Sequence, residues 1–435
     1  MKQAVVLIHG IGEQRPLETL RGFVDALNVG KDIRNKPDTI NLSFELRRLQ
    51  VGKSRNRPVT DFYEFYWAHH MRDTKLRMIF QWFSAILLKS PLKISKKLIP
   101  FYILGWLFVI STLFFLYHSI FINFEKYKVI FIVIVLALDY LFFRFIIGYI
   151  GDAARYLNPH PDNIDQRNKI KTECVQLLHK LHASKQYSRI IMVGHSLGSV
   201  IAYDAIRLYW SLYLTPESLL CSNQTVIESF KFRKDAIFKD SLSLNGKVQK
   251  YQELQNELWF ELRECKFSWL ISDFITLGSP LTHAEMLLAN NEDEFQRKKC
   301  EGEYPVCPPY DSEFEDIFIP KNIEKNDGTK MNVKFPRFHA PFACTRWTNI
   351  YFQHKYFFFG DFIGGPLNKV FGEGIRDVAV FLSPLLKRSW LTHILYWCVD
   401  EADEGKNHPL KRLKNYLFLD CFRGNRKRQE DWPPP

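Results

Sequence analysis

The sequence predicts an α/β fold: a doubly wound, mostly parallel sheet with an inserted transmembrane helical hairpin and lid-like insertions. Three observations support this fold class. Short apolar runs alternate with helical spacings, two long apolar stretches occupy residues 101–150, and a strand–turn–helix pattern surrounds Ser196. Strands that alternate with helices along a chain indicate parallel pairing, with helices on both faces of the sheet.

Residues 1–88 are predicted to form the first part of the α/β domain. Residues 5–8 are a continuous apolar run before a glycine turn, which is typical of a buried parallel strand. Apolar residues recur at helical spacing over 16–27, and apolar and polar residues alternate over 40–46 and 62–67. The expected order is therefore strand, helix, strand and strand.

Residues 89–155 are predicted to form the transmembrane helical hairpin, with spans at about 101–122 and 129–150. The first run contains no Lys, Arg, Asp or Glu, and the second contains only Asp139 and Arg144. A bilayer core of ~30 Å needs about 20 apolar residues in a helix, and both runs are that long. The alternative is a hairpin buried in the core, or a lid lying in the membrane plane.

The charges that flank the hairpin predict a multi-pass protein whose outer ends, and whose catalytic domain, lie in the cytoplasm. Four lysines precede the first span, whereas the loop between the spans holds two. Short cytoplasmic flanks carry the excess of basic residues. The N-terminal apolar run is only five residues long, so no signal peptide is expected.

Residues 156–400 are predicted to form the second part of the α/β domain. A helix is expected over 164–181, followed by a buried strand at 189–193 and a helix from Ser199 to about Tyr213. The later strand candidates are 274–277, 347–352 and 378–382.

Two segments, 215–268 and 285–340, do not follow the strand–helix rhythm and are predicted insertions over one edge of the sheet. Long irregular segments in such positions often serve as lids or substrate loops. The first insertion contains a helical pattern over 251–265, and a basic tail over 401–435 ends the chain.

The basic composition indicates an anionic partner. The 435 residues carry a formal net charge of +12, which is concentrated in residues 71–97 and 406–428. Such an excess fits nucleic acid or a membrane surface. No nucleic-acid-binding motif accompanies the charge. No two of the eight cysteines form a CxxC pair, which excludes the zinc-finger pattern. A membrane is therefore the expected partner, and nucleic acid is not. The basic tail contacts anionic lipid in this interpretation, or is simply a solvated surface.

The strongest chemical signal is the turn Gly194, His195, Ser196, Leu197 and Gly198, between a predicted strand and a predicted helix. A serine at such a sharp turn exposes its hydroxyl, and glycines on either side let neighbouring chain approach. The next backbone N–H, that of Leu197, points at a developing oxyanion. The alternative is an ordinary glycine-rich turn.

The turn after the first strand is the candidate for a second oxyanion donor. It reads His9, Gly10, Ile11 and Gly12. A His-Gly turn after an early strand commonly supplies such an N–H, and the Ile11 amide is the candidate here. Alternatively, the two glycines only form a tight turn with His9 packed beneath it.

A general base and an acid are expected after later strands, in the order serine, acid, histidine. Asp361 follows the strand predicted at 347–352, and His393 follows the strand predicted at 378–382. The base accepts the Ser196 proton, and the acid fixes the tautomer of the base and stabilises its imidazolium. The non-catalytic alternatives are that Asp361 only caps a turn or helix and that His393 is a core residue. The competing candidates are His354, His408 and Asp377.

Together these residues resemble the α/β-hydrolase superfamily of serine lipases and esterases. Residues 194–203 and the Gly-Ser-Pro-Leu run at 278–281 look like phospholipases of the DDHD type. Residues 346–351 and 361–367, with His393, Tyr396 and Trp397, are similar to uncharacterised bacterial membrane-anchored hydrolases. The resemblance implies catalytic roles for Ser196, Asp361 and His393. Phe362 departs from the proline that the family often has after the acid.

The predicted function is a membrane-anchored serine hydrolase that cleaves a carboxylic ester, a lipid or phospholipid, through an acyl-enzyme. The alternatives are a thioesterase or acyl-protein hydrolase, and a catalytically inactive membrane scaffold of the same fold. The expected partners are the lipid bilayer and the acyl-ester substrate. This chemistry requires no metal and no organic cofactor.

Overall fold

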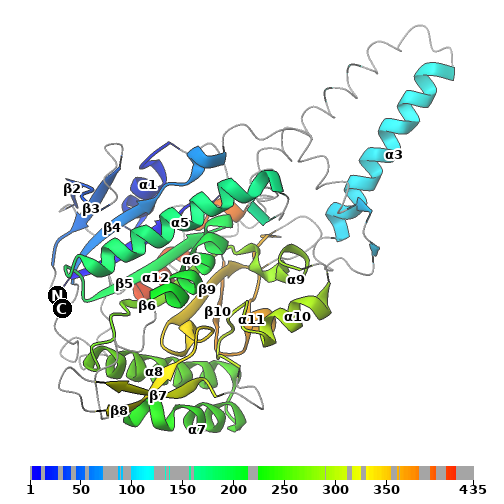
Figure 1. Cartoon of the computed structure of the whole chain (residues 1–435). Helices are drawn as coiled ribbons and strands as arrows, with labels where there is room; N and C mark the ends of the chain where they lie inside the picture. The colour runs from blue at the N-terminus through cyan, green and yellow to red at the C-terminus, as the bar shows by residue number, and fades with distance from the viewer. Residues whose placement is uncertain are drawn as a thin grey trace.

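A mostly parallel, eight-stranded sheet forms the centre of the computed structural model of the chain, with strand order β10-β9-β6-β5-β1-β4-β3-β2 (Figure 1). The structure describes residues 2–10, 15–27, 33–40, 46–53, 58–71, 87–88, 90–91, 99–121, 133, 137, 156–157, 161–213, 224–289, 291–310, 316–324, 330–353, 360–361, 363–381, 392–397 and 408–417.

The strands from β10 to β4 in this order are parallel, and an antiparallel pair extends the sheet at the β4 edge. Their bounds are β1 (Lys2–Ile8), β2 (Ile33–Pro37), β3 (Arg47–Val51), β4 (Val59–Phe65), β5 (Arg189–His195), β6 (Ile271–Leu277), β9 (Arg346–Phe352) and β10 (Arg376–Val380). Because parallel strands all end at one edge of a sheet, residues that follow β1, β5, β9 and β10 are brought to the same edge.

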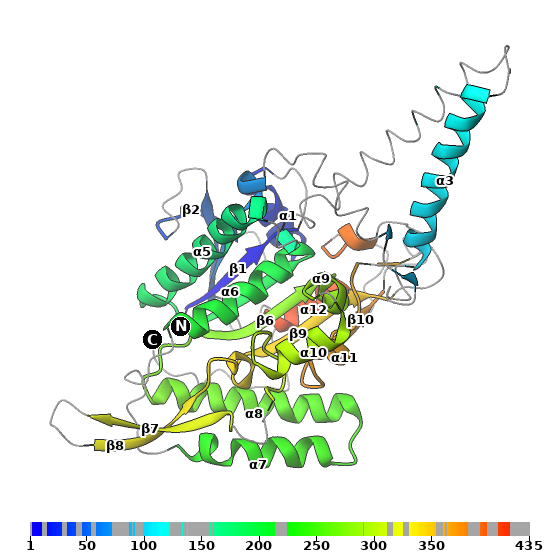
Figure 2. The same ribbon diagram turned by 45° about the vertical axis from the view of Figure 1, so that its right-hand side comes forward.

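Helices cover both faces of the sheet, as the doubly wound prediction requires (Figures 1 and 2). Val5 and Leu7 of β1 pack in one apolar cluster with α1 (Glu18–Ala26) and α12 (Pro409–Tyr416). Val6 and Ile8, which alternate with them, pack in the other cluster with α5 (Pro161–Ala183) and α6 (Leu197–Tyr213). A strand buried on both faces reads as a continuous apolar run, which is why β1 and β5 were visible in the sequence.

The described part of the first insertion, residues 224–268, packs against the sheet. It contains α7 (Thr225–Lys239) and α8 (Leu244–Glu264). The helix α8 begins seven residues before the helix predicted at 251–265. Gln255 of α8 donates hydrogen bonds to the carbonyls of Phe342 and Thr345 at 2.7 and 2.9 Å, so α8 is fixed to the chain just before β9. The helix pair lies on the opposite side of the molecule from α3 (Ile99–Phe121) in both ribbon views (Figures 1 and 2).

The second insertion has a small sheet of its own. The strands β7 (Phe318–Glu324) and β8 (Lys330–Pro336) pair antiparallel. Two short helices precede them, α9 (Ala284–Leu287) and α10 (Glu292–Cys300).

The strand predicted at 40–46 is wrong in its position. Ile40 lies in a turn, and residues 41–45 lie outside the described residues. The strands of this region are β2 and β3, which pair with each other on either side of the predicted segment. The strand β2 forms the edge of the sheet, and β3 lies between β2 and β4. Both are largely polar, so they lack the apolar alternation by which strands are recognised.

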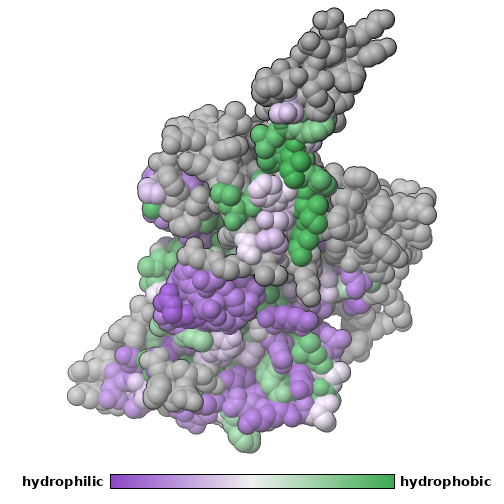
Figure 3. Space-filling view, turned by 90° about the vertical axis from the view of Figure 1, so that its right-hand side faces the viewer, coloured by the Kyte–Doolittle hydropathy of each residue, from purple (hydrophilic) through white to green (hydrophobic). Residues whose placement is uncertain are grey.

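The structure contradicts the predicted transmembrane hairpin. The helix α3 leaves the body of the protein and carries a strip of exposed apolar side chains (Figures 1 and 3). Yet counted over the residues that the structure describes, no helix is long and apolar enough to cross a membrane. Of the second predicted span, 129–150, only Val133 and Ala137 are described. The multi-pass location is therefore wrong too, because an apolar run in the sequence becomes a span only as an uninterrupted apolar helix of about 20 residues.

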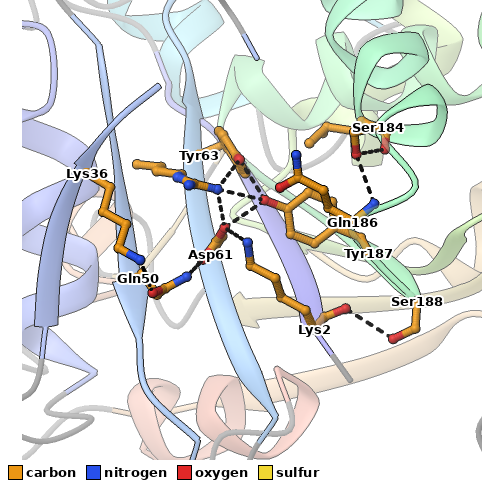
Figure 4. Close-up of polar contacts among 11 residues, drawn as sticks. Lys2, Lys36, Gln50, Asp61, Tyr63, Ser184, Gln186, Tyr187 and Ser188 are labelled. Atoms are coloured by element: carbon orange, nitrogen blue, oxygen red, sulfur yellow. Dashed lines mark hydrogen bonds and ion pairs between the residues drawn. The ribbon is translucent and has the colours of Figure 1, made fainter. Parts of the chain in front are cut away.

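A buried polar network joins the strands near their amino ends, away from the carboxyl edge of the sheet (Figure 4). The carboxylate of Asp61 on β4 is fully buried and forms ion pairs with Lys2 at 2.6 Å and with Arg48 at 2.8 Å. It also accepts hydrogen bonds from the Tyr187 hydroxyl and the Gln50 amide, both at 2.7 Å. The network therefore holds β1, β3 and β4 to the turn between α5 and β5.

Candidate active site

Three of the predicted site residues meet at the carboxyl edge of the sheet. The Nε2 atom of His393 lies 2.8 Å from the Ser196 hydroxyl, and its Nδ1 atom lies 3.0 and 3.1 Å from the two carboxylate oxygens of Asp361. All three side chains are buried. With the ring proton on Nδ1, His393 donates to Asp361 and leaves the Nε2 lone pair to accept from Ser196.

The backbone at Ser196 is left-handed, with φ at +52°. Residues other than glycine rarely adopt this conformation, and it turns the serine hydroxyl outward between β5 and α6. A Cβ atom at Gly194 would lie 2.4 Å from the Ser199 Cα atom, and one at Gly198 would lie 2.2 Å from the Ile8 carbonyl oxygen. The two glycines are therefore required by the close approach of backbone, as the sequence pattern predicts.

The turn after β1 lies against the nucleophile. A Cβ atom at Gly10 would lie 2.8 Å from the Cβ atom of Ser196. Ile11 and Gly12, the rest of the predicted oxyanion turn, lie outside the described residues. Leu197, the other predicted donor, is the first residue of α6, where backbone N–H groups have no partner within the helix.

His9 packs beneath this turn. Its ring stacks on the indole of Trp67 at 5.2 Å, and its carbonyl accepts a hydrogen bond from the Trp67 indole N–H at 3.0 Å. Burial lowers the pKa of His9 to about 4, although a hydrogen bond to the Gly10 carbonyl opposes that shift. His9 is therefore neutral at pH 7, and Trp67 fixes the chain that leads into the turn.

Asp361 is held as a carboxylate. Burial by itself would raise its pKa, but the charge of His393 and the hydrogen bonds of the site outweigh burial and hold the pKa well below its usual range. The backbone N–H groups of Ile363 and Gly364 donate to one carboxylate oxygen at 2.9 Å each. The Tyr396 hydroxyl donates to the other at 2.7 Å. A fixed negative charge therefore faces His393 Nδ1 at neutral pH.

Two glycines make room for this carboxylate. Gly278 has φ at +54°, and a Cβ atom there would lie 2.6 Å from the Tyr396 ring and 2.8 Å from Asp361 Oδ2. A Cβ atom at Gly364 would lie 2.6 Å from the same oxygen. The Gly-Ser-Pro-Leu run at 278–281 therefore borders the site.

Sequence reasoning missed two residues that support the arrangement. Tyr396 holds Asp361, and its pKa is raised well above the usual value by burial and by the charge of Asp361, so it remains a hydroxyl donor. His195 donates from Nε2 to the His393 carbonyl at 2.9 Å, and burial, followed by the charge of His393, lowers its pKa to about 3. His195 directly precedes Ser196, and Tyr396 is three residues after His393, but this closeness in sequence does not reveal the contacts.

The competing candidates occupy other positions. Asp377 accepts hydrogen bonds from the backbone N–H groups of Leu367 and Asn368 at 2.9 to 3.0 Å and from the Asn349 amide at 2.6 Å. His408 precedes α12, and its Nδ1 atom accepts from the Leu410 N–H at 3.3 Å. His354 lies outside the described residues. In the described part of the chain, the histidine bonded to the Ser196 hydroxyl is thus His393, and the acid bonded to His393 is Asp361.

Comparison with known proteins assigns no family to the chain. No protein-family model, no curated protein and no solved structure matches it. The resemblance to α/β-hydrolases stays a prediction that depends on the residues quoted for it.

Proposed function

We propose that the protein is a serine hydrolase that cleaves a carboxylic ester through an acyl-enzyme. The observation that carries the proposal is the hydrogen-bonded series from the Ser196 hydroxyl through His393 to Asp361, with Ser196 in the left-handed conformation at a strand–helix turn. A nucleophile, a base and a group that orients the base are the parts that acyl transfer needs.

In the first step, Ser196 Oγ attacks the acyl carbonyl carbon while His393 Nε2 takes the hydroxyl proton. The tetrahedral intermediate collapses, and the alcohol leaves with that proton. In the second step, His393 takes a proton from water, the resulting hydroxide attacks the acyl-enzyme, and the acid is released as Ser196 regains its proton. Ionised Asp361 stabilises the imidazolium that forms in both steps.

The negative charge on the substrate oxygen needs backbone donors. We assign one of them to the Leu197 N–H at the amino end of α6, and the second to the Ile11 N–H in the turn that begins at Gly10. Removing one such donor from an enzyme of this kind typically costs about 10²- to 10³-fold in kcat.

A lipid ester is the substrate class that we propose for this site. Its support is the likeness of residues 194–203 and 278–281 to phospholipases. A thioester or an acylated protein requires the same nucleophile and base. A panel of phospholipids, simple acyl esters and acyl-thioesters therefore separates these substrates, and phospholipid turnover as the fastest reaction is the expected result.

A fluorophosphonate probe tests the reaction class, because it phosphonylates only an activated serine. We expect the wild-type protein to be labelled and Ser196→Ala to be unlabelled. Ser211→Ala is the matched control, since Ser211 is an exposed serine on the same helix, bonded only to the Arg207 carbonyl in the described residues. A folded wild-type protein that stays unlabelled would sink the proposal and leave the inactive scaffold.

A further inference from the structure

A second group of chemically capable side chains lies outside the Ser196 site. His69 and His70 belong to the short 3-10 turn η1 (Ala68–Met71), which follows β4, and Glu173 lies on α5. One ligand atom from each of the three lies within 4.8 Å of the other two. Among the described residues, this is the one group of three histidine, cysteine or acidic side chains with that property.

The three side chains converge on one point although two of them are sequence neighbours. The His70 Nε2 atom lies 2.7 Å from a carboxylate oxygen of Glu173. The rings of His69 and His70 have centroids 3.9 Å apart, so both project to the same side of the turn. The His69 ring also stacks on Tyr66 at 5.6 Å, which restricts its rotation.

The donor set fits a zinc ion. Zn²⁺ binds imidazole nitrogen and carboxylate oxygen at about 2.0–2.2 Å, which places the ligand atoms of a tetrahedral site about 3.4 Å apart. The observed atoms need only small side-chain rotations to adopt that spacing, and the contact between His70 and Glu173 opens as each atom turns its lone pair to the metal. Mg²⁺ and Ca²⁺ prefer oxygen ligands, so two imidazoles disfavour them.

We propose that His69, His70 and Glu173 form a binding site for one Zn²⁺ ion, with water as the fourth ligand. The site is open to solvent on one side, because His69 is exposed and the Glu173 side chain is 44% exposed, whereas the His70 side chain is only 13% exposed. An ion can therefore enter without rearrangement of the core, and a water molecule can reach the remaining position.

A bound ion would join η1 to α5. The turn η1 directly follows Trp67, which holds the His9 carbonyl and stacks on the His9 ring. The zinc ion would thus clamp the segment that supports the chain leading into the turn at Gly10. This proposal depends on the three ligands and not on the chemistry of Ser196, so the failure of one leaves the other standing.

The test is zinc binding to the untagged full-length chain after removal of metal with a chelator. Titration of Zn²⁺ against a chromophoric zinc chelator gives affinity and stoichiometry. We expect one Zn²⁺ per chain, and an affinity at least about tenfold weaker in His69→Gln and in Glu173→Gln, since even supporting residues of metal sites contribute 10- to 100-fold. The control is His179→Gln, because His179 is exposed on the same helix but outside the group.

A second measurement separates a zinc site from a hydrogen bond that only joins η1 to α5. A ligand that binds the folded state raises the unfolding temperature by mass action, so Zn²⁺ should raise Tm in the wild type and in His179→Gln, and not in His69→Gln or Glu173→Gln. Circular dichroism without metal checks that all variants are folded. The proposal is overturned if the wild type does not bind Zn²⁺, or if it binds Zn²⁺ no more tightly than these two variants do.

Discussion

The substitution Asp361→Asn tests the catalytic arrangement most directly, because the structure allows each hydrogen bond of the variant to be followed. The backbone N–H groups of Ile363 and Gly364 both donate to Oδ1, which the amide oxygen of asparagine can replace. The amide nitrogen then takes the place of Oδ2, where it faces the Tyr396 hydroxyl and His393 Nδ1. The loop is therefore expected to keep its conformation.

The histidine tautomer, however, is expected to change. His393 Nδ1 lies 3.0 Å from Oδ2 and 3.1 Å from Oδ1. When the nearer of these positions becomes an amide N–H donor, Nδ1 acts as its acceptor and the ring proton moves to Nε2. The Nε2–H group then donates to the Ser196 hydroxyl, 2.8 Å away, and can no longer take its proton. Loss of the correct tautomer in a serine triad costs about 10⁴-fold in kcat, which corresponds to about 5.5 kcal/mol of transition-state stabilisation.

The assay is the hydrolysis rate of a p-nitrophenyl ester together with the rate of fluorophosphonate labelling. Asp377→Asn is the matched control, since Asp377 is bonded to backbone N–H groups of the same loop region. We expect it to keep kcat within about tenfold of the wild type, because it removes no group that touches His393 in the described residues. An Asp361→Asn protein with kcat within tenfold of the wild type would refute the reasoning, and an equal loss in Asp377→Asn would move the acid to that position.

Two further predictions concern stability. In Asp61→Ala, the cations of Lys2 and Arg48 lose a fully buried partner. We therefore expect the free energy of unfolding, measured with urea, to fall by about 3 kcal/mol. This value is at the low end of the cost of breaking a buried ion pair, because both cations are partly exposed. Glu64 is buried, and burial raises its pKa to about 7 despite a hydrogen bond from the Leu17 N–H. A carboxyl whose folded pKa lies above its unfolded value of about 4.3 stabilises the fold less as pH rises through that window. We therefore expect the wild type to lose stability between pH 5 and pH 8 by up to about 3 kcal/mol more than Glu64→Gln does.

Both predictions have clear contrary outcomes. If Asp61→Ala unfolds at the urea concentration of the wild type, the buried ion pairs do not contribute net stability. If the wild type and Glu64→Gln show the same change in stability between the two pH values, Glu64 is already ionised at low pH in the folded protein. Fluorophosphonate labelling at pH 7 serves as the control for Asp61→Ala, since that residue lies near the opposite edge of the sheet from Ser196.

The elements that the sequence predicted well are those whose environment is uniform along their length. The strands β1 and β5 are buried on both faces, so their apolar runs were continuous, and the structure confirms them. The structure also confirms β9, which is mostly buried although polar residues interrupt its apolar ones. The predicted starts of β1 and β5 were right to within three residues. The shortfall at β1 covers Lys2, Gln3 and Ala4, which also pair with neighbouring strands. The strands β2 and β3 were missed because a largely polar strand has no apolar pattern to read.

The hairpin prediction failed for a different reason. Hydropathy measures the composition of a segment, and it does not determine whether that segment forms the uninterrupted helix that a bilayer crossing needs. Composition could therefore suggest two spans over 101–150, while among the residues that the structure describes no helix meets the requirement.

The sequence by itself determined the local parts of the candidate site. The glycines around Ser196, the left-handed turn that they permit and the chain order of Ser196, Asp361 and His393 all follow from short-range sterics and strand–helix alternation. The tertiary structure alone decided which side chains touch. Asp361 and His393 are 165 and 197 residues beyond Ser196, and their hydrogen bonds are completed by Tyr396 from a turn and by His195 from the end of β5. Such contacts depend on the order in which the strands pair, and pairing order is set by the packing of the whole sheet, which no local pattern records.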